Sequence, residues 1–305
     1  MGEVIILGAG GFIGKDIAEF FLKRLPSVEL YSKHSGSICG IPVKKIDLTK
    51  NASKKELSGK KKVKSLIYLS AAVPNNLNSA TWELFIYNLK MHENVLECWQ
   101  KLNCHLIYAS SCSVYRQNKL SPWRESDVVN PKDYYSFSKI FGELMFLRAS
   151  KKYKLPLTVL RINSPFKVDS KHKTVVNAFI DRALKDKDIL LYGSGNRNQD
   201  FLYISDLARA FWAAYKRKAY GIFNIASGKT VTMRKLAEII IRLTGSSSRI
   251  VLSHRLDAQE HIKVNIDVSK SKRGLRFIPL FSLEQGLKEC ILKYRRIPYE
   301  NWDCS

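Results

Sequence analysis

Short runs of apolar residues alternate along this chain with longer stretches in which apolar residues return every third or fourth position. The short runs predict strands at Val4–Leu7, Val28–Tyr31, Leu66–Leu69, Leu106–Ala109 and Leu157–Leu160. The longer stretches predict helices at Ile13–Arg24, Thr81–Lys101, Asp133–Tyr153, Val175–Lys185, Ser205–Lys216, Met233–Thr244 and Leu283–Arg295. Continuous apolar strands that alternate with helices are typical of a parallel sheet covered on both faces. After Asn163 the alternation of strands and helices becomes less regular, which predicts a smaller C-terminal part.

Composition narrows the classes of protein. The chain has 305 residues, 45% of them hydrophobic, so it can bury a large core. No apolar run approaches the roughly 20 residues that cross a bilayer, and we expect a soluble, cytoplasmic protein without a membrane partner. The six cysteines include no C-x-x-C pair and the six histidines show no ligand spacing, so we predict free thiols and no metal site.

The formal net charge of +24 attracts polyanions, including nucleic acid and phosphorylated small molecules. The lysines are spread along the chain, with one dense run, KKKVK, at residues 60–64. We interpret them as a solvated surface, because an anionic substrate needs only a few such charges.

A glycine-rich turn, residues 8–14, lies between the first predicted strand and the first helix. Gly8 permits a tight turn, Gly11 lets a pyrophosphate approach backbone N–H groups, and Gly14 lets the helix pack closely on the strand. The phosphates then lie at the positive end of the helix dipole. A dinucleotide site that also includes Phe12 and Ile13 is therefore predicted, and a purely structural turn is the alternative.

The end of the second strand bears on the choice between NAD and NADP. NAD sites usually carry Asp or Glu there, to bind the ribose 2′-hydroxyl. Here Ser32 takes that position and Lys33 follows. A hydroxyl and a cation suit a 2′-phosphate, so NADP(H) is favoured. NAD(H) stays possible, because Glu29 would take the acidic role if the strand ended earlier.

Tyr135 and Lys139 are spaced i, i+4 and therefore share one helix face. A tyrosine with a pKa of about 10 is a poor base at neutral pH, and a nearby ammonium lowers that pKa. Ser111 could hydrogen-bond the same substrate oxygen. We predict that Ser111, Tyr135 and Lys139 are catalytic and pass a proton to or from an alcohol oxygen; a chance pair on a surface helix is the alternative.

In order and context these segments resemble the extended short-chain dehydrogenase/reductases, specifically the NAD(P)-dependent nucleotide-sugar epimerase/dehydratase family. The resemblance runs nearly end to end and extends to Asp47-Leu48, Leu69–Ala72, Asn88 with Asn94, Ile107–Tyr115, Gly193–Gly195, Gln199–Asp206, Phe223–Gly228 and Phe281–Leu287. It implies an α/β fold: a Rossmann-type doubly wound parallel sheet at 1–163, to which 201–226 returns. A smaller C-terminal α/β domain for a nucleotide-sugar substrate is implied at 164–200 and 227–305.

The resemblance also implies roles for single residues. The cofactor-binding set gains Asp47, Leu48, Leu69, Ala71, Ala72 and Asn88, in addition to Tyr135 and Lys139. The catalytic serine stands four residues before Tyr115, which is Ser111. The substrate-binding set consists of Ser111, Asn163, Ser164, Arg197 and Arg255. Gln199 replaces the family's common arginine.

Subtypes of the family differ just after the serine. Sugar 4,6-dehydratases carry Asp-Glu there, whereas this chain has Cys112-Ser113. GDP-fucose synthases place a cysteine two residues after the serine, where Ser113 stands. The remaining chemistry is redox at C4 of a nucleotide-diphosphate sugar.

We expect a 4-keto-sugar reductase that uses NADPH and supplies polysaccharide biosynthesis. A 4-epimerase with retained NAD is the alternative, and the resemblance implies a homodimer. A non-catalytic RNA-binding or NADP-sensing relative is not favoured, because such relatives tend to lose the tyrosine or lysine kept here.

Overall fold

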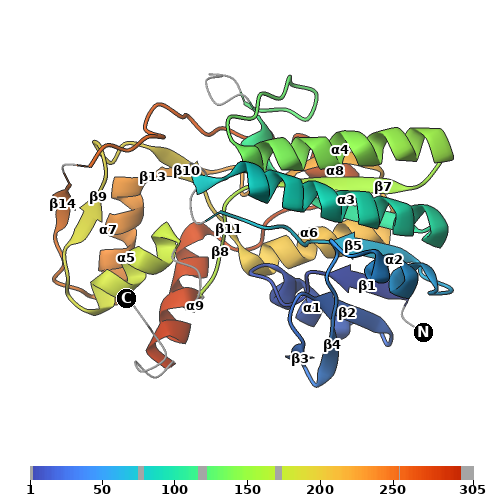
Figure 1. The fold of residues 1–305 in the computed structure, drawn as a ribbon. Coiled ribbons are helices and arrows are strands. Elements are labelled where there is room, and N and C mark those ends of the chain that lie inside the picture. The colour runs from blue at the N-terminus through green and yellow to red at the C-terminus, as the bar shows by residue number, and fades with distance from the viewer. Residues whose placement is uncertain (1–2, 75–78, 116–121, 169–173, 254, 297–305) are drawn as a thin grey trace.

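The computed structural model describes residues 3–74, 79–115, 122–168, 174–253 and 255–296. At its centre lies an eight-stranded sheet with the order β12-β7-β6-β5-β1-β2-β4-β3 (Figure 1). Its strands are β1 (Val4–Leu7), β2 (Val28–Ser32), β3 (Gly36–Ile38), β4 (Ile41–Lys45), β5 (Ser65–Tyr68), β6 (His105–Ser111), β7 (Leu157–Ile162) and β12 (Gly221–Ile225). Every pairing is parallel except that of β3 with β4. The predicted α/β fold with a doubly wound parallel sheet is confirmed.

Helices cover both faces of the sheet, because successive strand residues point to opposite sides. Val4 and Ile6 of β1 pack in the same core as α1 (Gly14–Leu22) and α6 (Ile204–Arg217). Ile5 and Leu7 pack instead with α2 (Asn51–Ser58), α3 (Trp82–Leu102) and α4 (Tyr134–Tyr153). This explains why the strands are apolar at every position rather than at every second one.

Four elements of this half, β3, β4, β12 and α2, were not predicted as strands or helices. β4 buries only Val43, which lies between Pro42 and Lys44, so no continuous apolar run marks it. β3 contributes only Ile38 to the core. In α2 only Ser53 and Leu57 are buried, which leaves a polar sequence without clear helical periodicity.

The smaller part lies beside the carboxyl ends of the strands, where the arrowheads of the sheet point (Figure 1). It contains α5 (Val175–Leu184), α7 (Met233–Thr244) and α9 (Leu283–Arg296), and the short α8 (Ser269–Gly274) packs on β12. Three strand pairs complete it: β8 (Pro165–Phe166) with β11 (Leu202–Tyr203), β9 (Ile189–Leu191) with β14 (Ile250–Leu252), and β10 (Asn198–Asp200) with β13 (Thr230–Thr232). Elements from both parts share one apolar core, so the two are joined by packing as well as by the chain.

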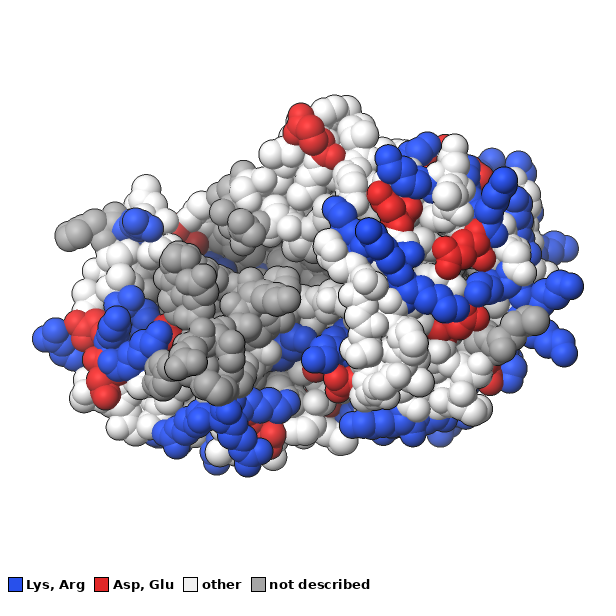
Figure 2. All heavy atoms as spheres, turned by 60° about the horizontal axis from the view of Figure 1, so that its bottom comes forward, with Lys and Arg blue, Asp and Glu red and all other residues white. Residues whose placement is uncertain are grey.

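Basic side chains are spread over the molecule rather than gathered at one place. Figure 2 shows lysine and arginine at both ends and along the lower rim of the visible face, with scattered acidic residues between them. None of the helices in the described ranges is long and apolar enough to cross a membrane.

Candidate active site

The glycine turn packs closely against the end of β2 and the segment after β5. The N–H groups of Gly8 and Ala9 both donate to the carbonyl of Tyr31, at 2.8 and 3.0 Å. Gly8 has a φ of +90°, and a Cβ there would lie 2.7 Å from the backbone nitrogen of Ser70. A Cβ on Gly14 would lie 1.9 Å from the Gly8 carbonyl oxygen. Only glycine fits either position, which is the close approach that a dinucleotide turn requires.

Further residues of the turn are accessible to solvent where α1 begins. Gly10 and Gly11 are exposed, and Phe12 and Ile13 are half-buried immediately before α1. Ile13, the N-cap residue, gives α1 no side-chain cap. A helix N-terminus without such a cap suits an anion, so these residues fit the pyrophosphate of a dinucleotide.

The end of β2 lies against this turn. A Cβ on Gly10 would come within 2.9 Å of the Ser32 hydroxyl, so Ser32 faces the turn directly. Glu29 lies inside the strand, where its carboxylate pairs with Lys44 at 2.9 Å and Lys60 at 2.8 Å. The strand does not end early, and Glu29 is not the residue at its carboxyl end.

Asp47 and Leu48 follow β4 at the same edge of the sheet. The carboxylate of Asp47 accepts hydrogen bonds from the N–H and the hydroxyl of Thr49, at 3.0 and 2.7 Å. These bonds lower the pKa of Asp47, and the charge of Lys33 acts in the same direction. Leu48 is buried, and its carbonyl accepts a hydrogen bond from Asn94 at 2.7 Å.

The segment after β5 carries the next predicted cofactor residues. Leu69 is buried and its N–H donates to Leu7, whereas Ala71 and Ala72 are half-buried. Asn88 of α3 is fully buried, and its side chain bonds the backbone of Ala72 and the hydroxyl of Ser138. Both amide hydrogens of Asn88 are therefore used within the protein, and a contact of Asn88 with the cofactor stays a prediction.

The proposed proton-transfer residues come from β6 and α4. Ser111 ends β6, and its hydroxyl accepts a hydrogen bond from the N–H of Ser113 at 3.1 Å. Tyr135 stands in the first turn of α4, which Asp133 caps by accepting from the Ser136 N–H at 2.9 Å. Lys139 lies one turn later, with Nζ 5.6 Å from the ring centroid of Tyr135.

Lys139 is anchored to the serine strand. Its ammonium donates to the carbonyl of Ala109 at 2.8 Å, two residues before Ser111. The side chain is 3% exposed, and burial lowers the pKa of Lys139 to about 8, although the Glu143 carboxylate acts in the opposite direction. At neutral pH the group is still an ammonium.

The expectation that Lys139 lowers the pKa of Tyr135 is wrong for the protein alone. Burial raises the pKa of the Tyr135 hydroxyl, and the charge of Asp133 raises it further. Desolvation of the phenolate is the largest cause of this shift. Tyr135 is consequently a protonated phenol, able to donate a proton.

His92 of α3, like Asn88, fixes α4 at this point. His92 is fully buried, with Nε2 3.1 Å from the Ser138 carbonyl and Nδ1 2.8 Å from the Tyr68 hydroxyl. Because a carbonyl only accepts, Nε2 carries the hydrogen and Nδ1 accepts from Tyr68. Burial lowers the pKa of His92 to about 3, so the ring is neutral and its tautomer is set.

Cys112 is buried, and its thiol does not take part in the predicted proton transfer. It is 1% exposed, its thiol donates to the Arg161 carbonyl at 3.2 Å, and burial raises its pKa well above the usual range. Cys112 begins the short 3-10 turn Cys112–Val114, and neither it nor Ser113 supplies the carboxylate of a dehydratase.

Besides Ser111, the predicted substrate residues divide into two groups. Ser164 and Arg197 line one pocket of about 180 Å³ together with Gln199, Phe201 and Met233. Arg197 is tied there to Asp257 at 2.7 Å and to Gln259 at 3.1 Å.

The other two do not line this pocket. Asn163 is buried and donates to the Asp200 carbonyl at 2.6 Å. Arg255 is exposed beside Tyr192 and does not line the pocket. The apolar wall of the pocket includes Phe166 and Val175. These residues were not predicted from the sequence, because they come from separate segments without a shared motif.

Comparison with known proteins adds an independent finding. A model of the NAD dependent epimerase/dehydratase family matches residues 4–226. A UDP-N-acetyl-alpha-D-glucosaminuronate decarboxylase of Bacillus cytotoxicus is 30% identical, over 96% of this chain and 98% of its own. A UDP-glucuronate 4-epimerase of Thermodesulfobacterium geofontis is 26% identical, over 95% of each chain.

A solved structure shares the fold. The UDP-glucose 4-epimerase of Thermotoga maritima superimposes with a TM-score of 0.87, over 96% of this chain and 98% of its own, at 22% identity. The family match covers more than half of the chain, and the resemblance inferred from the motifs is confirmed. This protein belongs to the NAD-dependent epimerase/dehydratase family of extended short-chain dehydrogenase/reductases.

Proposed function

We propose that this protein is an NADPH-dependent reductase of a 4-keto sugar carried on a nucleotide diphosphate. The observation that carries the choice of NADPH is the end of β2. Ser32 faces the glycine turn, Lys33 follows it, and Glu29 is engaged by lysines inside the strand. A 2′-phosphate can accept hydrogen bonds from a hydroxyl and an ammonium, whereas a carboxylate at this position would repel it.

The proposed chemistry assigns one role to each residue. The bound cofactor supplies hydride to the keto carbon. Tyr135, a protonated phenol, donates its proton to the sugar oxygen as negative charge develops there. The Lys139 ammonium stabilises the phenolate that remains, and the Ser111 hydroxyl donates to the same sugar oxygen.

The residues of the substrate half favour an anionic ligand but do not identify it. Arg197 and Ser164 line the pocket, and its apolar wall offers a surface for a nucleobase. We propose that Arg197 and Ser164 contact the nucleotide diphosphate, with Asn163 supporting the floor through Asp200. Arg255 would contact substrate only at the pocket's outer side. The boundaries at 163, 200 and 226 stay proposals.

A 4-epimerase that retains NAD is the second candidate. The observation in its favour is the 26% identity, over almost the full length, to a UDP-glucuronate 4-epimerase. Such an enzyme would use the same Ser111, Tyr135 and Lys139, with Tyr135 first accepting the proton of the sugar hydroxyl.

The experiment that separates the two begins with the purified protein. It is denatured, and any released nucleotide is identified by mass spectrometry. Release of NADP(H), or an empty site that then binds NADPH more tightly than NADH, supports the reductase. Retained NAD(H) supports the epimerase and overturns the Ser32 argument.

Substrate assays follow with NADPH oxidation as the readout. A nucleotide-linked 4-keto-6-deoxy sugar should be reduced. Turnover of UDP-glucuronate or UDP-N-acetylglucosaminuronate without net NADPH consumption would contradict the reductase assignment.

We also propose a homodimer that packs through α3 and α4. Both helices expose large apolar side chains: Trp82 and Ile86 on α3, and Tyr134, Phe137, Phe141 and Leu144 on α4. Their rings contact one another, as in the pairs Trp82–Tyr134 and Phe85–Phe141. A contiguous apolar surface of this kind is typical of a protein–protein interface, and a second copy would cover it across a two-fold axis.

A further inference from the structure

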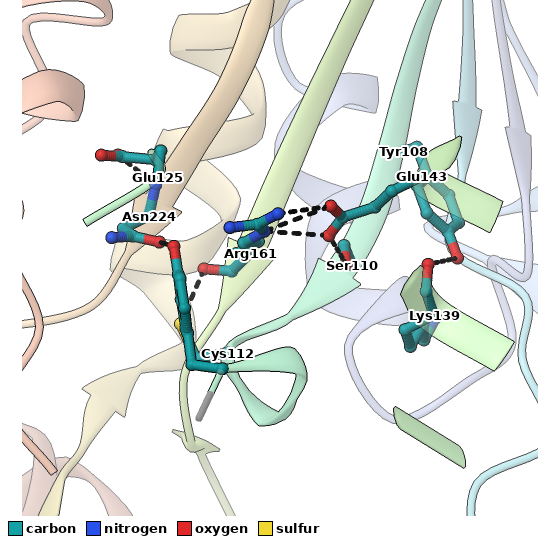
Figure 3. Close-up of polar contacts among 9 residues, drawn as sticks. Tyr108, Ser110, Cys112, Glu125, Lys139, Glu143, Arg161 and Asn224 are labelled. Carbon is teal, nitrogen blue, oxygen red and sulfur yellow. Dashed lines mark hydrogen bonds and ion pairs between the residues drawn. The ribbon is translucent and has the colours of Figure 1, made fainter. Parts of the chain in front are cut away.

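A buried ion pair lies one helical turn beyond Lys139. Glu143 of α4 is fully buried, and Arg161 of β7 is 3% exposed. The guanidinium binds the carboxylate in two places, at 2.7 Å from NH2 to Oε2 and at 3.0 Å from Nε to Oε1 (Figure 3). The hydroxyl of Ser110 donates to the same carboxylate. Buried charges are costly unless they are paired in this way, and neither the glycine turn nor the substrate pocket uses them.

This pair connects the elements that carry the proposed catalytic residues. Glu143 and Lys139 are spaced i, i+4 and share one face of α4. Ser110 directly precedes Ser111 on β6. On the other side, the carbonyl of Arg161 accepts the thiol hydrogen of Cys112, which directly follows Ser111 (Figure 3). The ion pair thus holds Ser110, and the backbone of Arg161 holds Cys112 on the other side of the serine.

Lys139 lies one helical turn before Glu143 on α4. Besides Tyr135 and Glu143 on its own helix, Lys139 has Tyr108 of β6, with Nζ 5.3 Å from the ring centroid, and His92 of α3 beside it. Burial keeps His92 and both phenols neutral at pH 7, since it lowers the pKa of His92 and raises that of Tyr108 and Tyr135. Within the described part of the chain, Glu143 is therefore the anion that offsets the burial of Lys139.

We propose that Glu143, held by Arg161, is a positioning residue that keeps Lys139 an ammonium beside Tyr135 and fixes the end of β6 that carries Ser111. The inference rests on the proposed function for its catalytic meaning. Its electrostatic part does not, because the charge state of Lys139 can be measured without substrate.

The test is an NMR titration of protein labelled with ¹³C at the lysine Cε. The Lys139 signal is assigned by its loss in Lys139→Arg. Surface lysines titrate at about 10.4, which separates them from a buried lysine. Glu143→Gln, which keeps the size and hydrogen-bonding oxygen of the side chain, should lower the midpoint of Lys139 by about one pH unit.

The control variants separate charge from structure. Glu143→Asp keeps the anion and should leave the midpoint near that of the wild type, and Glu238→Gln on the surface of α7 should not move it. If Glu143→Gln does not fold because Arg161 is left unpaired, Glu143→Leu/Arg161→Met removes both charges. The midpoint of Lys139 should still fall, but by less than one pH unit, because the Arg161 cation is removed together with the anion. An unchanged midpoint in a folded variant overturns the proposal.

The catalytic part is tested by the pH profile of kcat. In Glu143→Gln the alkaline limb should move to lower pH in step with the Lys139 midpoint. A lower Tm with an unmoved limb would reduce Glu143 to a structural role and overturn the positioning claim. Should the proposed reductase activity itself be absent, the NMR result still decides whether Glu143 sets the charge of Lys139.

Discussion

Asn88 holds the backbone of Ala72 on both sides. The N–H of Ala72 donates to Oδ1 at 2.7 Å, and Nδ2 donates to the Ala72 carbonyl at 3.0 Å. The same Nδ2 group donates to the hydroxyl of Ser138 at 3.2 Å, which ties this segment to α4. One side chain therefore sets the distance between the segment after β5 and the helix that carries Tyr135.

Asn88→Leu should destabilise the protein by about 1–3 kcal/mol, because it leaves the N–H and carbonyl of Ala72 without their partner. NADPH affinity should fall as well, since the Leu69–Ala72 segment loses its anchor. Urea unfolding and fluorescence titration with NADPH measure the two effects. Unchanged stability together with unchanged affinity would show that Ala72 is held by other contacts.

Tyr135→Phe should lower kcat by about 100-fold or more, because the phenol that donates the proton is gone. The Kd for NADPH should change little, since the ring remains. Turnover of the 4-keto sugar and NADPH binding are measured on the same preparation. Tyr134→Phe, at the neighbouring exposed position, is the control, and a fully active Tyr135→Phe would rule out the mechanism.

Ser32→Asp should shift the cofactor preference from NADPH toward NADH by about tenfold or more, since a carboxylate repels the 2′-phosphate and binds a free 2′-hydroxyl. The ratio of kcat/KM for the two cofactors measures the shift. Ser35→Asp, beyond the end of β2, serves as the control for charge alone. An unchanged ratio would mean that Ser32 does not contact the ribose.

Stability should fall as the pH drops from about 6.5 toward 4. Burial lowers the pKa of His92 to about 3 and that of His105 to about 4. The unfolded chain binds these protons at about pH 6.5 and the folded protein does not, so acid favours unfolding. Each histidine accounts for about 2 kcal/mol between pH 6.5 and 5. Urea unfolding at pH 7.5 and 5 measures this loss of stability. The His92→Gln variant should lose about half as much, and a loss as large as that of the wild type would mean that other groups cause it.

Leu144→Glu should convert the proposed dimer to a monomer, because the exposed apolar face of α3 and α4 would then carry an unpaired charge. Sedimentation velocity measures the molecular mass in solution. Leu280→Glu, which changes a 65% exposed leucine outside α3 and α4, is the matched control. A wild-type protein that sediments as a monomer would contradict the dimer.

Much of the fold followed from local sequence because the buried parallel strands are apolar at every position. The five strands predicted in the sheet are all present, and Thr81 and Asp133 cap α3 and α4 where those helices were predicted to begin. The elements β3, β4 and α2 were missed, since an element with one or two buried residues leaves no continuous pattern. The strand β12 was not predicted either, because its sequence, GIFNI, places Asn224 among the apolar residues.

The parallel sheet, the glycine turn and the Tyr135–Lys139 pair could be predicted from local sequence, because each depends on residues close together in the chain. What surrounds them became visible in the folded chain alone. The environment of Lys139 combines Ala109, Glu143 and, through the ion pair, Arg161, which come from three elements. The pocket beside Arg197 likewise joins distant segments. Burial and long-range pairing set pKa values and pocket shape, and neither is encoded in local spacing.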